Sequence, residues 1–252
     1  MGDVAEVALD ASAAFDRHAK SFPLIVQRLL LENCDPAGES VDDLRRALGL
    51  PARDDAGAAV AHLARLLPRE ACEALRSAVD AAEDSEADSV DGLPDHQVDV
   101  GLDEIEALVG RDHARSLLRA VATFAPRLEA PKSGDVRCFV RRYSATTRPW
   151  NPFHTDTATV TLNVSLCDDE SFCGGHLLVC DGAEIRRVRR GEGDATVHSA
   201  ALLHGVSRVT SGARYSLIVF VDGEMRKRGP AATKRPRNAT EEDRGGSFCF
   251  RT

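Results

Sequence analysis

The chain has 252 residues, of which 43% are hydrophobic and 29% charged, with a formal net charge of −8 at pH 7. These values describe an ordinary globular protein of one sizeable domain with an extension, or of two small domains. They exclude a membrane span, because no apolar run reaches about 18 residues, and the excess of acids disfavours general nucleic-acid binding.

The acidic start of the chain lacks the bases of a secretory signal. We therefore expect an intracellular protein, cytoplasmic or nuclear.

Residues 1–67 have the composition and spacing of short helices. One helix is predicted to begin at Pro23, one to be capped by Ser40, and one to cover residues 58–67, where apolar residues recur at helical spacing. We interpret residues 1–67 as a helical N-terminal extension, which the sequence does not connect to a function.

Two further helices are expected in the first half of the main domain, which we place at residues 68–225. The first begins at Pro68, and a longer amphipathic helix follows over residues 102–121. Between them, residues 80–91 are rich in acids and contain no Lys or Arg, so we expect a solvated loop there.

The hydrophobic pattern of the sequence changes at Val136. From there on the apolar runs are short, rich in β-branched residues, and alternate with polar residues. Turn signals such as Cys173-Gly174-Gly175 separate these runs. The predicted strands cover residues 136–143, 159–166, 176–180, 184–189, 195–199 and 214–221. Several strands at this spacing favour a sandwich or jelly roll over a parallel α/β sheet, so we expect an α+β protein.

Residues 226–252 form a tail rich in Gly, Pro and charge, which we expect to be disordered. Six bases and no acid occur between Arg226 and Arg237. This basic segment is either a nuclear-import signal or a solubilising tail.

The first chemical signal is the triplet His154-Thr155-Asp156, which follows a proline-rich loop and is predicted to open a strand. Residues i and i+2 of an extended chain point to the same face, so the imidazole and the carboxylate converge. A third nitrogen ligand from elsewhere would complete the facial triad of two histidines and one carboxylate that is typical of non-haem iron(II) oxygenases.

Three histidines are candidates for the third ligand, namely His176, His198 and His204. We favour His204, because Gly205 follows it and lets the backbone approach closely. His198 is better interpreted as a core residue or a support for the ligands, and His176 as an exposed residue.

Ten residues after His204, Arg214 begins a strand with Ser216 on the same face. A guanidinium there is suited to bind a carboxylate with two hydrogen bonds, and the serine hydroxyl adds a donor. The charges of iron(II), Asp156, Arg214 and a bound ligand with two negative charges cancel, as a partly buried site requires.

These motifs together resemble the prolyl 4-hydroxylase-like branch of the 2-oxoglutarate/iron(II) dioxygenase superfamily. The matching segments are Arg142-Tyr143, the His154 triplet, residues 161–166, residues 172–177 and residues 206–216. The resemblance is specific from Val136 to Val221. It departs from the usual pattern at Arg214, where many relatives have Lys, and at His176, where Glu is common.

The resemblance implies a double-stranded β-helix, a form of jelly roll, that binds iron(II) through His154, Asp156 and His204. It implies that Arg214, with help from Ser216 and Tyr143, binds 2-oxoglutarate, and that oxygen is the second co-substrate, with ascorbate as a supporting reductant. The reaction implied is hydroxylation coupled to formation of succinate and carbon dioxide, on a protein or peptide substrate such as a prolyl residue.

Simpler interpretations remain for several of these residues. Tyr143 is equally a packed aromatic residue, Ser216 an ordinary strand residue, and Trp150 either lines a site or anchors its loop. Arg148 either attracts an acidic substrate or lies in solvent. Two further functions also stay open: a metallohydrolase that holds zinc in the same triad, and a binding module without turnover.

Overall fold

The computed structural model describes residues 13–52, 59–82, 88 and 91–224. The tail at residues 226–252, with its candidate import signal, lies outside the described residues. Within the described part of the chain, no helix has both the length and the apolar character needed to cross a bilayer.

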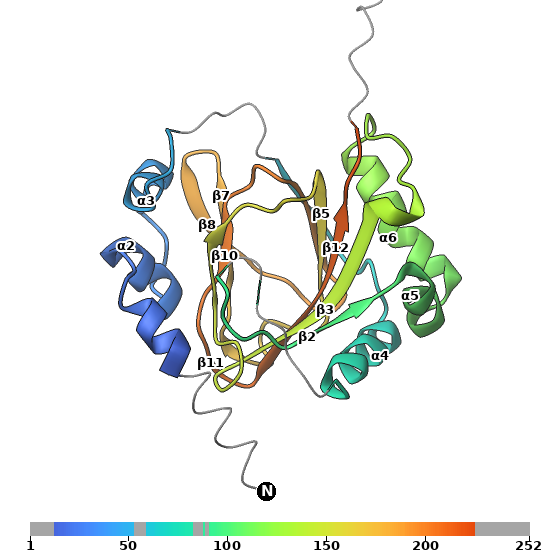
Figure 1. The fold of residues 1–252 in the computed structure, drawn as a ribbon, viewed down its shortest axis with the longest axis horizontal. Coiled ribbons are helices and arrows are strands. Elements are labelled where there is room, and N and C mark those ends of the chain that lie inside the picture. The colour runs from blue at the N-terminus through green and yellow to red at the C-terminus, as the bar shows by residue number, and fades with distance from the viewer. Residues whose placement is uncertain (1–12, 53–58, 83–87, 89–90, 225–252) are drawn as a thin grey trace, which may run out of the picture.

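Two antiparallel sheets form the centre of the molecule (Figure 1). The major sheet has the order β1-β9-β5-β12-β3-β2 and the minor sheet the order β4-β10-β7-β8. The major strands are β1 (Val60–Leu63), β2 (Gln97–Val100), β3 (Val136–Ser144), β5 (Val160–Ser165), β9 (Ala195–Ser199) and β12 (Ala213–Val221). The minor strands are β4 (Asn151–His154), β7 (Leu177–Asp181), β8 (Glu184–Val188) and β10 (His204–Val206).

A two-stranded ribbon of β6 (Cys173–Gly174) and β11 (Val209–Ser211) lies beside the two sheets. Except for the hairpin of β7 and β8, neighbouring strands come from distant parts of the sequence, as in a jelly roll, and the helices lie outside the sheets. The predicted α+β class with a double-stranded β-helix core is therefore confirmed. All six strands predicted from alternation are present, with their ends shifted by one residue at most.

Alternation along β12 assigns its two faces to different surroundings. Leu217, Val219 and Val221 belong to the hydrophobic core beneath the helices. Arg214 and Ser216, offset by one residue, therefore face the interior between the two sheets. One strand thus contributes both to the core and to the candidate site.

Helices α4 (Arg69–Asp80), α5 (Leu102–Val109) and α6 (Arg111–Phe124) cover the outer face of the major sheet (Figure 1). A short 3-10 turn, η2 (Ser133–Asp135), precedes β3. The single helix expected over residues 102–121 is in fact two, because Gly110 adopts a φ of 84° that only glycine tolerates easily.

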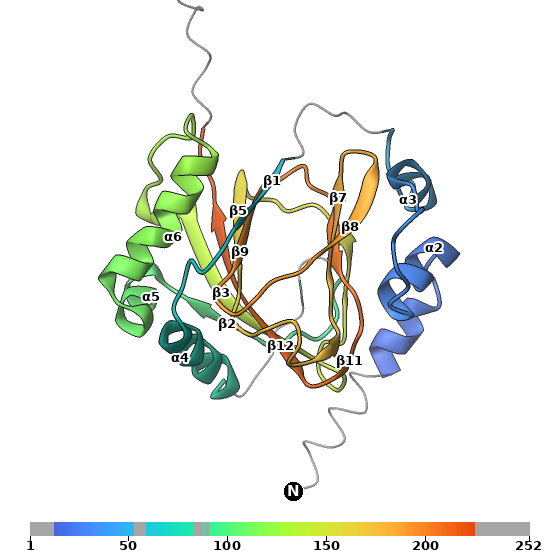
Figure 2. The same ribbon diagram turned by 180° about the vertical axis from the view of Figure 1, so that it is seen from behind.

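The N-terminal segment packs against the outer face of the minor sheet, as Figure 2 shows from behind. It consists of residues 13–19 in helical conformation, α2 (Leu24–Val26), the π-helical turn η1 (Gln27–Leu31) and α3 (Val41–Ala47). Ser40 caps α3 as predicted, with its hydroxyl accepting from the backbone amides of Asp42 and Asp43.

The helix predicted over residues 58–67 is wrong, because Val60–Leu63 forms strand β1 at the edge of the major sheet. Its apolar spacing fits a helix, but pairing with β9 provides its backbone groups with long-range partners that a local pattern does not reveal. The domain boundaries at residues 67 and 225 stay predictions, although β1 belongs to the major sheet by its hydrogen bonds.

The acidic segment is exposed at Asp80, the last residue of α4, but it is not a solvated loop at Asp88 and Asp91. The side chains of Asp88 and Asp91 are buried, and with Asp95 they surround Arg141 and Arg148 in what we term the acid–arginine cluster. Arg148 Nη2 lies 2.9 Å from Asp91 Oδ2, and Arg141 Nη2 lies 2.5 Å from Asp95 Oδ2. Arg148 therefore neither contacts solvent nor is free to attract a substrate.

The acid–arginine cluster secures the loop that leads into β4. Arg148 Nη2 also donates to Asn151 Oδ1 at 2.5 Å. Trp150 is fully buried, with its ring 5.1 Å from those of Phe15 and Phe22. Trp150 is thus a loop anchor, the second of the two roles that the sequence leaves open.

Candidate metal centre and interior arginines

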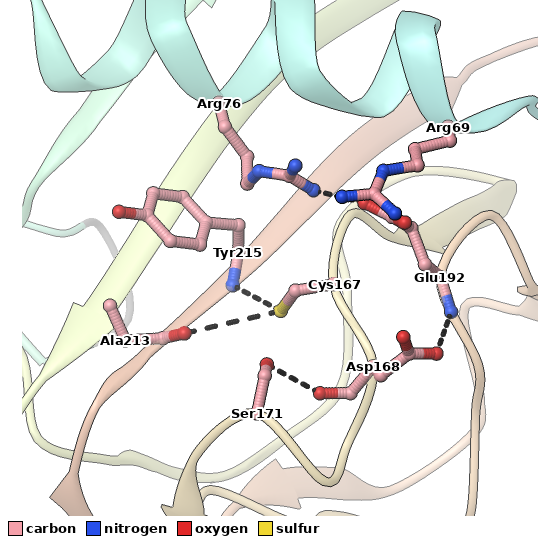
Figure 3. Close-up of a pocket in the computed structure, with 8 residues that line it drawn as sticks. All are labelled: Arg69, Arg76, Cys167, Asp168, Ser171, Glu192, Ala213 and Tyr215. Carbon is pink, nitrogen blue, oxygen red and sulfur yellow. Dashed lines mark hydrogen bonds and ion pairs between the residues drawn. The ribbon is translucent and has the colours of Figure 1, made fainter.

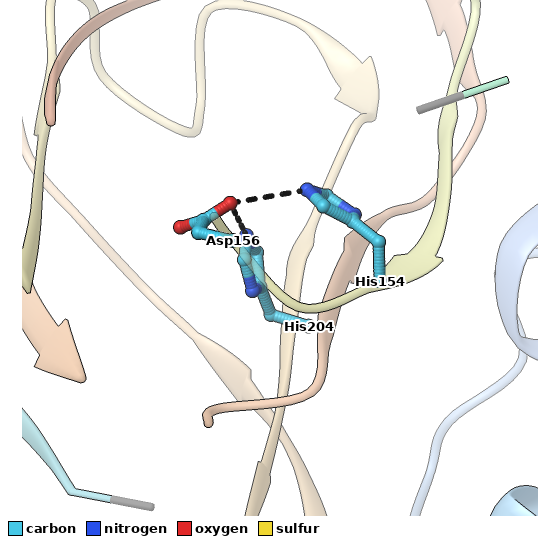
Figure 4. A group of neighbouring side chains, drawn as sticks. All are labelled: His154, Asp156 and His204. Atoms are coloured by element: carbon cyan, nitrogen blue, oxygen red, sulfur yellow. Dashed lines mark ion pairs between the residues drawn. The ribbon is translucent and has the colours of Figure 1, made fainter. Parts of the chain in front are cut away.

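Three side chains converge at the end of the minor sheet (Figure 4). His154 is the last residue of β4 and pairs in register with His204, the first residue of β10. Asp156 lies in the connection to β5, so the triplet ends a strand instead of opening one. One ligand atom from each of His154, Asp156 and His204 lies within 4.8 Å of the others.

Both histidines are held in a tautomer that can bind a metal through Nε2. His154 Nδ1 lies 2.8 Å from the carbonyl oxygen of Pro152, and His204 Nδ1 lies 3.0 Å from that of Leu202. A carbonyl only accepts, so each Nδ1 carries the proton and each Nε2 presents a lone pair. The Nε2 atoms lie 3.5 Å and 3.8 Å from Asp156 Oδ1, for His154 and His204 respectively.

Asp156 is oriented by the major sheet. The Thr161 hydroxyl on β5 donates to Asp156 Oδ2 at 2.6 Å, which turns Oδ1 toward the histidines. Burial alone raises the pKa of Asp156, but its contacts with His154 and His204 and the hydrogen bond from the Thr161 hydroxyl outweigh burial and hold that pKa below its usual range. The carboxylate is therefore ionised, as a metal ligand must be.

His204 and His198 are both kept neutral by their surroundings. Burial, followed by the neighbouring His154, lowers the pKa of His204 to about 3. Burial likewise lowers the pKa of His198, whose Nε2 lies 3.7 Å from Asp156 Oδ2 and whose ring centroid lies 4.8 Å from that of His204. His198 thus contacts the candidate ligand Asp156 without joining the group.

His176 is not part of this group, as expected, but it is half-buried where the sequence predicts exposure. Burial lowers its pKa. The reason for the burial is the connection between β6 and β7, where the backbone amide of His176 donates to the hydroxyl of Ser207, a buried residue of the facing loop.

The predicted anion-binding residues lie together on the interior faces of β12 and β3. Arg214 is 1% exposed and pairs in register with Tyr143, whose ring centroid lies 4.8 Å from the guanidinium carbon. Among the described residues, none accepts a hydrogen bond from Nε, Nη1 or Nη2 of Arg214, and the Ser216 hydroxyl also lacks a partner. Such a group of buried, unused donors is costly unless an anion fills it.

Arg190, which the sequence analysis does not identify, is a second buried guanidinium in this region. It is 3% exposed, and its Nη1 donates to Asn163 Oδ1 at 2.7 Å on the interior face of β5. Its Nε and Nη2 and the hydroxyl of Thr196 have no partner among the described residues. The run Arg186, Arg187, Arg189, Arg190 resembles a solvated face, so no local pattern distinguishes its last member.

A hollow of about 380 Å³ on the outer surface, between α4 and the end of β12, is a different kind of site (Figure 3). Its arginines are already paired, Arg76 with Glu192 and Arg69 with Glu73 at 3.0 Å, and Asp168 accepts from the backbone amide of Glu192 at 2.8 Å. Cys167 accepts from the backbone amide of Tyr215 at 3.4 Å. No orphaned donor or acceptor among the described residues marks it as a binding site.

The triad fits a divalent transition metal. Two imidazole nitrogens and one ionised carboxylate oxygen face a common point, and three ligands leave coordination positions open for other molecules. The second hydrogen bonds of all three ligands are satisfied, by Pro152, Leu202 and Thr161.

No protein-family model and no curated protein sequence matches the chain. Among solved structures, a prolyl hydroxylase from Trichoplax adhaerens, in complex with a hypoxia inducible factor oxygen degradation domain peptide fragment, matches with a TM-score of 0.53. It is 13% identical and is matched over 65% of this chain and 83% of that one.

Two other solved structures are similar at lower scores. A Pseudomonas putida prolyl-4-hydroxylase has a TM-score of 0.49 at 18% identity, over 65% of this chain and 92% of that one. The alpha-ketoglutarate-dependent epimerase SnoN from nogalamycin biosynthesis has a TM-score of 0.48 at 16% identity, over 65% and 77%. At these identities the likeness concerns the fold. The chain therefore shares the fold of the prolyl hydroxylase from Trichoplax adhaerens, as its sequence motifs indicate, and holds a His-Asp-His group within it.

Proposed function

We propose that this protein is an iron(II)- and 2-oxoglutarate-dependent dioxygenase. The observation that carries the proposal is the buried Arg214, which faces the same interior as the triad and has no acceptor among the described residues. A metallohydrolase gives Arg214 no role, whereas an anionic co-substrate with one end on the metal requires a cation at its other end.

In this proposal His154, Asp156 and His204 hold iron(II), and Arg214 and Ser216 bind the far carboxylate of 2-oxoglutarate. Tyr143 lies beneath the guanidinium of Arg214 and restricts its orientation. Bound iron supplies the activation of oxygen that couples loss of carbon dioxide from 2-oxoglutarate to substrate hydroxylation. The chain contributes the ligand geometry, the charge balance and the exclusion of water.

The test is succinate formation by anaerobically purified protein supplied with iron(II), ascorbate, 2-oxoglutarate and oxygen. His154→Ala should abolish succinate formation, because the site loses one of three ligands. His62→Ala, which removes an exposed histidine outside the triad, should leave it unchanged. If His154→Ala forms as much succinate as the wild type, the proposed iron site is wrong.

A protein or peptide, with a prolyl residue as the first choice, is the proposed substrate. The support is the fold likeness to prolyl hydroxylases, one of which was solved with a peptide fragment. A screen of proline-containing peptides for a mass gain of one oxygen tests this part separately. Matched peptides with alanine in place of proline are the controls, and modification of both sets equally would overturn the prolyl assignment.

A further inference from the structure

The interior of the molecule contains two buried guanidiniums, of Arg190 and Arg214, which we term the arginine pair. Each is at most 3% exposed. Together they hold eight N–H donors for which no described residue provides an acceptor: five on Arg214, and three on Nε and Nη2 of Arg190. The Ser216 and Thr196 hydroxyls beside them are also unpartnered.

Strand register places the two arginines at the same end of the interior. Asn163, which accepts from Arg190, lies two residues from Ser165 on the same face of β5, and Ser165 is directly opposite Ser216 on β12. The two guanidiniums are close enough for their charges to interact. Burial, followed by the charge of Arg214, lowers the pKa of Arg190 to about 9.

The same strand also fixes the direction from the arginine pair to the triad. Thr161, which donates to Asp156, precedes Asn163 by two residues, a step of roughly 7 Å along an antiparallel strand. The interior face of β5 thus runs from the metal ligands, past Arg190, to the position opposite Ser216. Arg190 lies between the metal end and the Arg214 end of this line.

Two cations here need more negative charge than the described side chains provide. Asp169 is the acid whose charge raises the pKa of Arg190, but it is only half-buried, and its Oδ2 accepts from the backbone amide of Arg190. A carboxylate offers about four acceptor positions and suits a pair of guanidiniums better than a single one.

We propose that Arg190 is a second binding residue for the far carboxylate of the co-substrate, which the two guanidiniums of the arginine pair hold between them. This inference rests on the proposed function. It makes the site selective for 2-oxo dicarboxylic acids, because a 2-oxo acid with an apolar end leaves both cations buried without an anion.

The test measures binding without turnover. Protein loaded with Mn²⁺ is titrated anaerobically with 2-oxoglutarate and, separately, with 2-oxopentanoate, which has the same chain length but ends in a methyl group. The variants are Arg190→Met, Arg190→Lys and the control Arg189→Met, which removes the exposed arginine next in the chain. Mn²⁺ affinity and the thermal midpoint are measured for each protein.

We expect Arg190→Met to weaken 2-oxoglutarate binding by roughly 10- to 100-fold, the range for hydrogen bonds to charged groups, with Mn²⁺ affinity unchanged. Arg190→Lys keeps the positive charge but loses the planar set of guanidinium N–H donors. Its affinity for 2-oxoglutarate should therefore lie between those of wild type and Arg190→Met. The preference for 2-oxoglutarate over 2-oxopentanoate should shrink by the same factor, and Arg189→Met should behave as wild type.

Two results separate this inference from the proposed function. If wild-type protein with Mn²⁺ does not bind 2-oxoglutarate, the proposed function fails, and this inference with it. If wild type binds and Arg190→Met or Arg190→Lys binds equally well with an unchanged preference, only the role of Arg190 is overturned. A lower thermal midpoint for Arg190→Met with unaltered affinity also overturns it, because it shows a structural role.

Discussion

Two groups of buried arginines lie in this protein, in opposite electrostatic conditions. In the acid–arginine cluster, Arg141 and Arg148 face three carboxylates of the chain. In the arginine pair, Arg190 and Arg214 leave eight donors without acceptors among the described residues. A buried cation that has its own carboxylates stabilises structure, whereas one that lacks them is a candidate to bind an anion.

The comparison predicts its largest effect on stability at Arg148. Arg148→Met leaves buried carboxylates without their counter-charge, so the free energy of unfolding should fall by about 3–5 kcal/mol. Arg214→Met removes no ion pair given by the structure. Its free energy of unfolding should therefore fall by much less when no ligand is present. Urea denaturation of the two variants measures both values, and equal losses would remove the distinction between the two groups.

Arg214→Met should instead change ligand binding. Loss of one partner of a buried charge pair costs about 2–5 kcal/mol, which corresponds to at least about 30-fold weaker 2-oxoglutarate binding. Iron affinity should stay near the wild-type value, because Arg214 lies outside the triad. Titration calorimetry measures how many times weaker the variant binds 2-oxoglutarate than the wild type does. An unchanged 2-oxoglutarate affinity would refute the assignment of Arg214.

Thr161→Val should weaken metal binding, by a smaller factor than that by which Arg214→Met weakens 2-oxoglutarate binding. The hydroxyl holds Asp156 Oδ2, and loss of such a partner typically reduces metal affinity by about 10- to 100-fold. Competition with a metal chelator measures the change. Thr159→Val, at a residue whose hydroxyl donates to the carbonyl of Gly223, is the matched control and should retain wild-type affinity.

The smallest expected effect concerns the pH dependence of stability. Burial raises the pKa of Asp95, only partly opposed by Arg141 and Arg148, and Asp88 adds to the shift. An acid with a raised folded-state pKa stabilises the fold fully below its unfolded pKa and loses that contribution as pH rises through the folded value. Asp95→Asn should flatten the plot of the free energy of unfolding against pH between the unfolded and folded pKa values of Asp95. An unchanged slope of that plot would count against the raised pKa of Asp95.

Much of the site could be predicted from the sequence, because its signals are local. The triplet at His154, the Gly after His204 and the ten-residue step to Arg214 reflect strand geometry. The strands that carry the two histidines, β4 and β10, were missed, because four and three residues are too short to show alternation.

The remaining features depend on long-range contacts that a sequence does not display. Arg148 and Asp91 are 57 positions apart, so their ion pair has no local pattern. In the sequence, Arg190 cannot be distinguished from its solvated neighbours. Only the fold brings it into contact with Asn163, 27 positions earlier. Strand β1 has helical spacing, and only its pairing with β9 makes it a strand.

The most direct test of the central claim is calorimetric titration of 2-oxoglutarate into anaerobic protein, with and without iron(II). The account predicts binding at one site per chain that iron strengthens, because one end of the ligand contacts the metal and the other the arginine pair. Iron-loaded protein that does not bind 2-oxoglutarate would contradict the claim and leave the buried Arg214 without the anion proposed for it.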